Sequence, residues 1–138
     1  MENDCIFCKI IKGEIPSSKV YEDNDFLVFM DIYPIARGHT LIIPKYHCRN
    51  ALDTPAEIGA KLYPLITKIS NAVKKSYNAD GIMVMQFNEP SAGQEVYHSH
   101  VHIIPRYEND KLNINIPPRL KVDIEDIIKD SEKIKQSL

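Results

Sequence analysis

The five histidines of this 138-residue chain lie in two short segments, and three of them form an alternating run: His98, His100 and His102. Side chains of an extended strand alternate between its faces, so these three imidazoles are expected to share one face. The run spans about 13 Å at roughly 3.3 Å per residue, which is too long for one tetrahedral zinc ion to bind all three. Two of them could share an ion, and one would remain for nucleophilic or acid–base chemistry. The alternative is a strand whose polar outer face happens to be histidine.

Cysteine supplies a second candidate, because Cys5 and Cys8 have the spacing of a metal-binding knuckle. Redox sites use the same spacing, but they place small residues or proline between the cysteines, whereas Ile6 and Phe7 lie here. Two cysteines buried as small apolar residues are the other interpretation. Cys48 makes the cysteine count odd, and this favours metal or reduced thiols over a disulfide framework.

The composition is typical of a soluble globular protein with one domain over residues 1–138, since 43% of the residues are hydrophobic and 26% are charged. A net charge of −2 without a run of basic residues argues against a nucleic-acid or membrane-surface binder. No apolar stretch approaches the roughly 20 residues that span a bilayer. The first residues lack the basic and apolar regions of a secretory signal, so we expect a cytoplasmic protein.

Apolar periodicity and turn residues predict an α+β domain with a five-stranded antiparallel sheet, one long helix and short terminal helices. The strands are expected at residues 19–22, 26–32, 40–43, 82–87 and 97–104. The long helix is expected to begin with Thr54 as N-cap and Pro55 at the first helical position, and Pro64 should kink it or leave a carbonyl unpaired. Uncovered sheet edges and apolar surface favour a dimer.

These segments together resemble the histidine triad (HIT) family, whose motif is His-x-His-x-His followed by two apolar residues, as at residues 98–104. Further matching segments follow the family's order near its spacing: residues 5–11, 13–16, 20–23, 29–32, 38–45 and 93–96. The resemblance covers roughly residues 4–107 and leaves residues 108–138 as a C-terminal extension. It implies the HIT fold, in which two subunits join their sheets into one ten-stranded sheet. The closest branch is that of the zinc-binding nucleoside phosphoramidate and nucleotide hydrolases.

The resemblance also implies a covalent nucleotidyl-histidine mechanism. His100 matches the nucleophile that attacks the α-phosphorus of a purine nucleoside 5′-phosphoramidate or related nucleotide of the AMP or GMP type. His102 and His39 match the flanking histidines that contact the phosphate and stabilise its oxygens. Taken alone, His39 would be interpreted as a solvated residue at the end of a strand.

The remaining site residues implied by the resemblance bind the nucleotide. Asp31 matches an acceptor for the ribose hydroxyls, and Asn88 matches a position that bonds the 5′ oxygen or the phosphate. The segment of Gly93, Gln94, Glu95 and Val96 matches a phosphate loop, and the walls around the base match Phe7, Ile10, Phe29 and Ile32. Without the resemblance, Asp31 and Asn88 are ordinary turn or strand-end residues, and the apolar residues are ordinary core.

Glu95 departs from the best-known phosphoramidases, which have serine at this position and use its hydroxyl to help protonate the leaving amine. A protonated carboxyl would do the same, whereas a carboxylate would repel an anionic leaving group. The resemblance therefore implies the phosphate site and leaves the preferred leaving group open.

The zinc-binding members combine two cysteines with two histidines, and this chain has all four: Cys5, Cys8, His47 and His98. Four protein ligands with no open position make a structural zinc site. The leading interpretation is thus a nucleotide hydrolase or nucleotidyl transferase that binds structural Zn²⁺. The alternatives are a dinucleoside polyphosphate hydrolase, a nucleotide-binding regulatory protein with incidental turnover, and a small zinc protein that binds other macromolecules.

Overall fold

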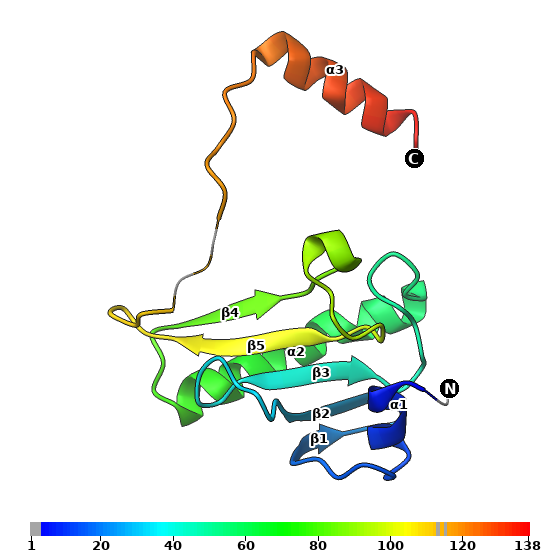
Figure 1. Cartoon of the computed structure of the whole chain (residues 1–138), viewed down its shortest axis with the longest axis vertical. Coiled ribbons are helices and arrows are strands. Elements are labelled where there is room, and N and C mark those ends of the chain that lie inside the picture. Colours follow the sequence, from blue (N-terminus) through cyan, green and yellow to red (C-terminus); the bar gives the residue numbers. More distant parts are fainter. Residues whose placement is uncertain (1–3, 113, 115) are drawn as a thin grey trace.

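The computed structural model describes residues 4–112, 114 and 116–138. Residues 1–3 of the predicted domain and two positions of its C-terminal extension lie outside the described residues. At its centre is a five-stranded antiparallel sheet in the order β1-β2-β3-β5-β4 (Figure 1). The elements are β1 (Lys19–Glu22), β2 (Phe26–Met30), β3 (Thr40–Pro44), β4 (Gly81–Met85), β5 (Val101–Arg106), α1 (Ile6–Ile11), α2 (Ala56–Ser76), a 3-10 turn η1 (Pro90–Ala92) and α3 (Ile124–Lys135). The predicted α+β class and its antiparallel sheet are confirmed.

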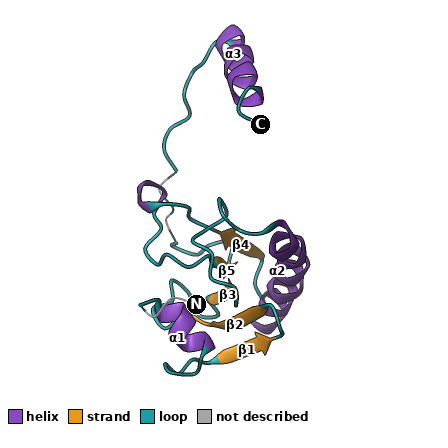
Figure 2. Ribbon diagram, turned by 90° about the vertical axis from the view of Figure 1, so that its right-hand side faces the viewer, coloured by secondary structure: helices purple, strands orange, loops and turns teal. Residues whose placement is uncertain are grey.

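The long helix α2 covers one face of the sheet (Figure 2). Its buried side chains recur at helical spacing and pack against inward-facing residues of the sheet, including Val101 and Ile103 of β5. Pro64 lies on the exposed side, and the helix continues through it as one element of 21 residues. The predicted N-cap is wrong: Pro55 takes that position, and the Thr54 hydroxyl donates to the Asn50 carbonyl at 2.7 Å instead.

The opposite face of the sheet holds a second apolar cluster beneath α1. Phe7 and Ile10 of this short helix pack on residues of β2 and β3, among them Phe29 and Leu41. Because both faces are covered here, β2 and β3 are buried almost throughout instead of alternating. This arrangement brings the cysteine segment over the sheet, on the side away from α2 (Figure 2).

The predicted boundaries of β5 are wrong in a way that matters for the histidine run. The strand begins at Val101, so His102 lies in β5, while His98 and His100 precede it. The residues before β5 form hydrogen bonds with one another and with the segment after β3. His100 Nδ1 lies 2.7 Å from the His98 carbonyl oxygen, and the Ser99 N–H donates to the Cys48 carbonyl at 2.8 Å. The expectation of one strand presenting all three histidines by alternation therefore fails, although all three still lie on the α1 side of the sheet.

The C-terminal helix α3, one of the predicted short terminal helices, lies apart from the sheet at the end of an extended segment (Figure 1). Every residue of α3 is exposed. Among the described residues, no helix combines the length and the apolar character that a membrane crossing needs.

Candidate active site and metal cluster

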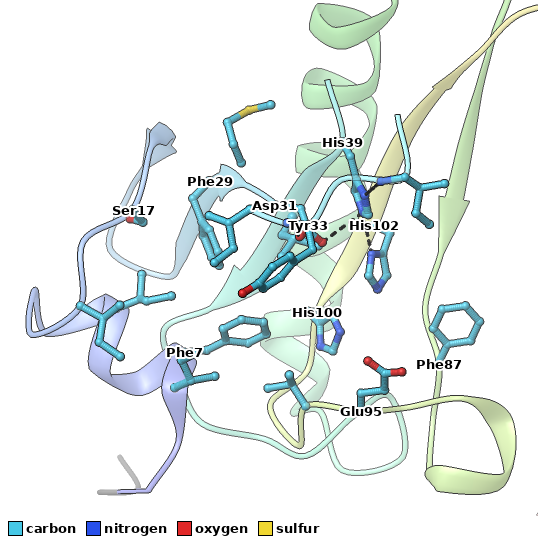
Figure 3. A pocket seen from close by; sticks show the side chains of 18 of the residues that line it. Phe7, Ser17, Phe29, Asp31, Tyr33, His39, Phe87, Glu95, His100 and His102 are labelled. Carbon is cyan, nitrogen blue, oxygen red and sulfur yellow. Dashed lines mark hydrogen bonds and ion pairs between the residues drawn. The ribbon is translucent and has the colours of Figure 1, made fainter. Parts of the chain in front are cut away.

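A cavity of about 490 Å³ opens on the α1 side of the sheet (Figure 3). Most of the site residues predicted from the sequence line it: Phe7, Ile10, Phe29, Asp31, Ile32, His39, Gly93, Glu95, Val96, His100 and His102. Phe7 and Phe29 lie toward one end, in edge contact with ring centroids 5.6 Å apart. Glu95 and Phe87 lie on the other side of His100 (Figure 3). The cavity thus has an aromatic end and an end that carries a carboxylate.

The hydrogen bond of His100 determines which ring nitrogen can react. Its Nδ1 lies 2.7 Å from the His98 carbonyl oxygen, which only accepts, so we assign the proton to Nδ1. In the neutral ring this leaves the lone pair on Nε2. The Phe7 ring packs edge-on against His100 with centroids 5.2 Å apart and restricts its orientation. His100 therefore presents a neutral ring nitrogen with an available lone pair in the cavity wall.

A second set of hydrogen bonds links His39 to His102. The Ile35 N–H donates to Nδ1 of His39 at 3.1 Å, which assigns the His39 proton to Nε2. The Nε2–H of His39 donates to Nδ1 of His102 at 2.8 Å (Figure 3). The Asp31 carboxylate lies 3.5 Å from Nε2 of His39. The His102 proton is then on Nε2. His102 is consequently arranged as a hydrogen-bond donor, held in that state by His39.

Burial keeps this histidine group neutral. Desolvation lowers the pKa of His102 to about 4, and the neighbouring His100 and His39 add to the effect. Desolvation also lowers the pKa of His100, against the bond to the His98 carbonyl, and that of His39, against the Asp31 charge. At neutral pH the three rings act as lone-pair and N–H groups and carry no charge.

Two of the predicted nucleotide-binding residues do not line the cavity. The Gln94 side chain is buried, and its amide holds the loop by accepting from the Glu89 N–H at 2.8 Å and donating to the Arg49 and Val96 carbonyls. Asn88 accepts the Ala51 N–H at 2.8 Å through Oδ1. Both side chains therefore shape the loop that precedes the triad.

The loop depends on two further residues that the sequence analysis missed. Glu89 has a φ of 78°, unusual for a residue with a side chain, and its carboxylate accepts from Arg49 Nε and from Asn50 Nδ2, each at 2.6 Å. The Asn50 amide also donates to the Gln94 side chain at 3.0 Å. These partners are about 40 residues apart in sequence, so no local spacing could reveal them. Gly93 supplies the other left-handed turn, with a φ of 96°.

The second histidine group is a cluster of Cys5, Cys8, His47 and His98. The Nδ1 atoms of His47 and His98 are 3.1 Å apart, and the sulfur–nitrogen distances are 3.3 Å from Cys8 to His47 and 3.4 Å from Cys5 to His98. Tetrahedral zinc with Zn–N near 2.0–2.1 Å and Zn–S near 2.3 Å requires ligand atoms roughly 3.3–3.8 Å apart. The four ligand atoms converge to within 4.8 Å of one another, so donor types and spacing both fit this ion.

His98 is oriented toward the cluster by its other nitrogen. Nε2 lies 2.8 Å from the Pro44 carbonyl oxygen, which places the proton there and leaves the lone pair on Nδ1, among the sulfurs. A backbone acceptor behind a histidine ligand is the usual partner in metal sites. His98 is fully buried, and desolvation lowers its pKa to about 4.

The model of the HIT domain matches residues 12–109, and the chain belongs to the histidine triad (HIT) family. Protein hit of Bacillus subtilis is 45% identical over 75% of this chain and 72% of its own length. Adenylylsulfatase HINT3 of Arabidopsis thaliana is 44% identical over 81% of this chain and 57% of its own length. Adenosine 5′-monophosphoramidase HNT1 of Saccharomyces cerevisiae is 47% identical over 74% of this chain and 62% of its own length. The family resemblance found in the sequence is confirmed.

Solved structures show the same fold. SMU.412c from Streptococcus mutans superposes with a TM-score of 0.94 at 44% identity, covering 99% of this chain and 87% of that chain. A Zn-bound histidine triad family protein from Mycobacterium smegmatis superposes with a TM-score of 0.76 at 38% identity, over 84% of each chain. In this chain, the ligand atoms of Cys5, Cys8, His47 and His98 are close enough together that they could hold an ion.

Proposed function

We propose that this protein hydrolyses purine nucleoside 5′-phosphoramidates, or related nucleotides, through a covalent nucleotidyl-His100 intermediate. The observation that carries the proposal is the bond from His100 Nδ1 to the His98 carbonyl, which leaves the Nε2 lone pair for attack in the cavity. Two relatives named as an adenosine 5′-monophosphoramidase and an adenylylsulfatase support adenine nucleotides as the substrate class.

The proposed reaction has two displacements at phosphorus. Nε2 of His100 attacks the α-phosphorus and forms a P–N bond, while the bond from phosphorus to the leaving amine breaks. The amine keeps the electron pair and takes up a proton from water. Water then attacks the same phosphorus and loses a proton, and the bond to His100 breaks. The products are the nucleoside 5′-monophosphate and the amine, and Nε2 regains its lone pair.

The other lining residues receive roles that follow from their atoms. The Nε2–H of His102 donates to a phosphate oxygen and opposes the charge that develops there. The Asp31 carboxylate accepts the ribose hydroxyls, and the backbone of Gly93 and Glu95 approaches the phosphate. The apolar end around Phe7 and Phe29 receives the base.

The charge of the cavity favours an amine leaving group. Among its described lining residues, the carboxyl groups are Asp31 and Glu95, and there is no lysine or arginine. A leaving sulfate or nucleoside polyphosphate would lie near the Glu95 carboxylate with no cationic side chain to offset the repulsion. We therefore favour phosphoramidates over dinucleoside polyphosphates and over adenylyl sulfate. A regulatory protein with incidental turnover is the remaining alternative.

We also propose that Cys5, Cys8, His47 and His98 hold a structural zinc ion in a reducing compartment such as the cytoplasm. When bound, the ion would link α1 to the segment after β3 and to the residues before β5, and it would supply folding energy. Four protein ligands leave no position for a substrate. All three cysteines are free thiols, as the reduced state requires.

The decisive experiment is incubation with adenosine 5′-phosphoramidate, followed by quenching in alkaline denaturant, because a phosphorus–imidazole bond is labile in acid. We expect release of AMP and a protein adduct of one adenylyl group that maps to His100. A diadenosine polyphosphate assayed in parallel should turn over more slowly, and Glu95→Gln should narrow the difference. Tight AMP binding without turnover or adduct would favour the regulatory alternative, and faster cleavage of the dinucleotide would overturn the leaving-group assignment.

A further inference from the structure

Four exposed apolar side chains lie around the cavity that holds the catalytic histidines. Ile6, Ile32, Tyr33 and Ile35 all line it, yet they are 46%, 76%, 85% and 50% exposed. Single exposed apolar residues are ordinary on a protein surface, whereas a group of them around a cavity indicates a ligand with apolar surface of its own. Tyr33 is the largest and most exposed of the four, and neither the family motif nor the proposed mechanism uses it.

We propose that the Tyr33 ring packs on the outward side of the bound nucleoside, holds it against the apolar inner wall, and favours purines over pyrimidines. This inference rests on the proposed function, which places a nucleotide in the cavity. The inner wall contains two buried rings, Phe7 and Phe29, which are 7% and 4% exposed and lie in edge contact. In the view of Figure 3, the Tyr33 ring extends over the space between these two rings and His100. A flat base in that space would have the inner wall on one side and Tyr33 on the other.

The backbone of Tyr33 is fixed to the carboxylate that is proposed to hold the ribose. The Tyr33 N–H donates to Oδ1 of Asp31 at 2.8 Å, whereas the other carboxylate oxygen lies 3.5 Å from Nε2 of His39. One short turn therefore sets the position of both the ring and the ribose acceptor. Rotation of an exposed side chain is fast, and tyrosine loses few torsions when it becomes ordered. The ring can consequently close on a nucleoside at a small cost in conformational entropy.

The size of the base decides how much this contact contributes to binding. Every base has a flat face that stacks on an aromatic side chain, and the loss of one such stack weakens binding by about 5- to 150-fold. A purine has two fused rings and a pyrimidine has one, so a purine covers more of the Tyr33 ring and more of the inner wall. Removal of the ring should therefore weaken the binding of purine nucleotides more than that of pyrimidine nucleotides.

Calorimetry of the full chain with AMP and UMP measures the contact without turnover. Tyr33→Ala should weaken AMP binding by at least about fivefold and UMP binding by less, so that the preference for AMP falls. Tyr33→Phe keeps the ring and should bind AMP within about twofold of the wild type. Tyr63→Ala is the matched control, because Tyr63 is 72% exposed but lies on α2, on the other side of the sheet. Equal losses for AMP and UMP, or equal losses in Tyr33→Phe and Tyr33→Ala, would overturn the proposal.

A tryptophan reporter tests whether the ring lies against the base. The chain has no tryptophan, so Tyr33→Trp and Tyr63→Trp each carry a single one. Adenine stacked on an indole quenches its fluorescence, and AMP should therefore quench Tyr33→Trp and leave Tyr63→Trp unchanged. If AMP binds the wild type and Tyr33→Ala equally and does not quench Tyr33→Trp, this inference is overturned and the proposed nucleotide site stands. If AMP does not bind the wild type at all, the proposed site is contradicted together with the role of Tyr33.

Discussion

His98 and His100 are two residues apart and both buried from solvent, but their rings present opposite nitrogens. Each donates one ring N–H to a backbone carbonyl, but His98 does so through Nε2 to Pro44 and His100 through Nδ1 to His98 itself. The remaining lone pair is consequently Nδ1 in His98, directed at two sulfurs, and Nε2 in His100, in the wall of the cavity. The position of a carbonyl oxygen, and not the type of side chain, separates the proposed metal ligand from the proposed nucleophile here.

Phe7 marks the boundary between the two groups of histidines. Its ring makes edge contacts with both His98 and His100, at centroid distances of 5.8 Å and 5.2 Å. Phe7 lies in α1, directly before Cys8, so the metal cluster and the cavity wall share one short helix. If the two groups are separate, a substitution in the cysteine–histidine cluster should alter mainly stability and metal content. A substitution in the cavity wall should alter mainly the rate of the chemical step.

The largest effect is expected on the cavity side. His100→Ala should reduce turnover of adenosine 5′-phosphoramidate by several orders of magnitude, because removing a covalent nucleophile eliminates the two-step route. Zinc content and the circular dichroism spectrum should match the wild type. A variant that retains a tenth of the activity, or an adenylyl group that maps to His98 or His102, would show that the roles within the run are assigned wrongly.

A smaller loss of activity is expected at His39, which in the proposed mechanism acts on the phosphate through His102. His39→Ala removes the N–H that holds His102 as a donor, at 2.8 Å, and should slow kcat by roughly 10²–10³, the cost of one lost oxyanion donor. His39→Gln keeps an N–H donor and should recover part of the rate. If both variants lost activity as completely as His100→Ala, His39 would have to take part in the covalent step.

The metal side should respond in stability. Cys8→Ala removes one ligand of the proposed zinc site and should cost about 3 kcal/mol or more, which corresponds to a fall in Tm of roughly 10 °C. Cys48→Ala is the matched control, since Cys48 is also buried but lies outside the cluster. Metal analysis of wild-type protein from zinc-replete medium should give one zinc per chain, and its absence would contradict the site. A larger loss in the chemical step than in stability would contradict the separation of the two groups.

The fold was predictable from the sequence where the pattern is local. The apolar spacing that predicts the long helix α2 depends only on neighbours in the chain. The start of β5 could not be predicted from the sequence. His98 and Ser99 lie outside the strand because they bond with Pro44 and Cys48, more than 45 residues away. Thr54 has the residue type of an N-cap, but a tertiary bond to the Asn50 carbonyl takes its hydroxyl.

The same division applies to the candidate site. Residues that the family motif marks, such as Asp31 and His102, were named from the sequence and line the cavity. The residues that hold the loop before the triad could not be predicted from the sequence. Glu89 and Asn50 act through a hydrogen bond between distant segments, and Glu89 has a left-handed backbone that no spacing encodes. Gln94 has the motif's residue type, yet its side chain turns inward to hold this loop.

The smallest predicted effect concerns the charge state of His102. With its pKa lowered to about 4, mainly by burial, the ring should stay neutral from pH 8 to pH 5. In the unfolded chain its pKa is near the ordinary value of about 6.5, so the unfolded state binds the proton more readily. The stability contributed by the neutral ring is therefore fully present above pH 6.5 and is lost as the pH falls toward 4.

Histidine-selective NMR of the full chain measures this titration residue by residue. The ring resonance of His102 should titrate with a midpoint near pH 4. In the His39→Ala variant this midpoint should rise, because His102 becomes less buried and no longer lies beside a second imidazole that opposes its positive charge. In His102→Gln the fall of Tm between pH 6.5 and pH 4 should be shallower than in the wild type. A wild-type midpoint near 6.5 would mean that water reaches the ring. His102 would then become a cation at mildly acidic pH, and the neutral donor chain from His39 would no longer describe the cavity.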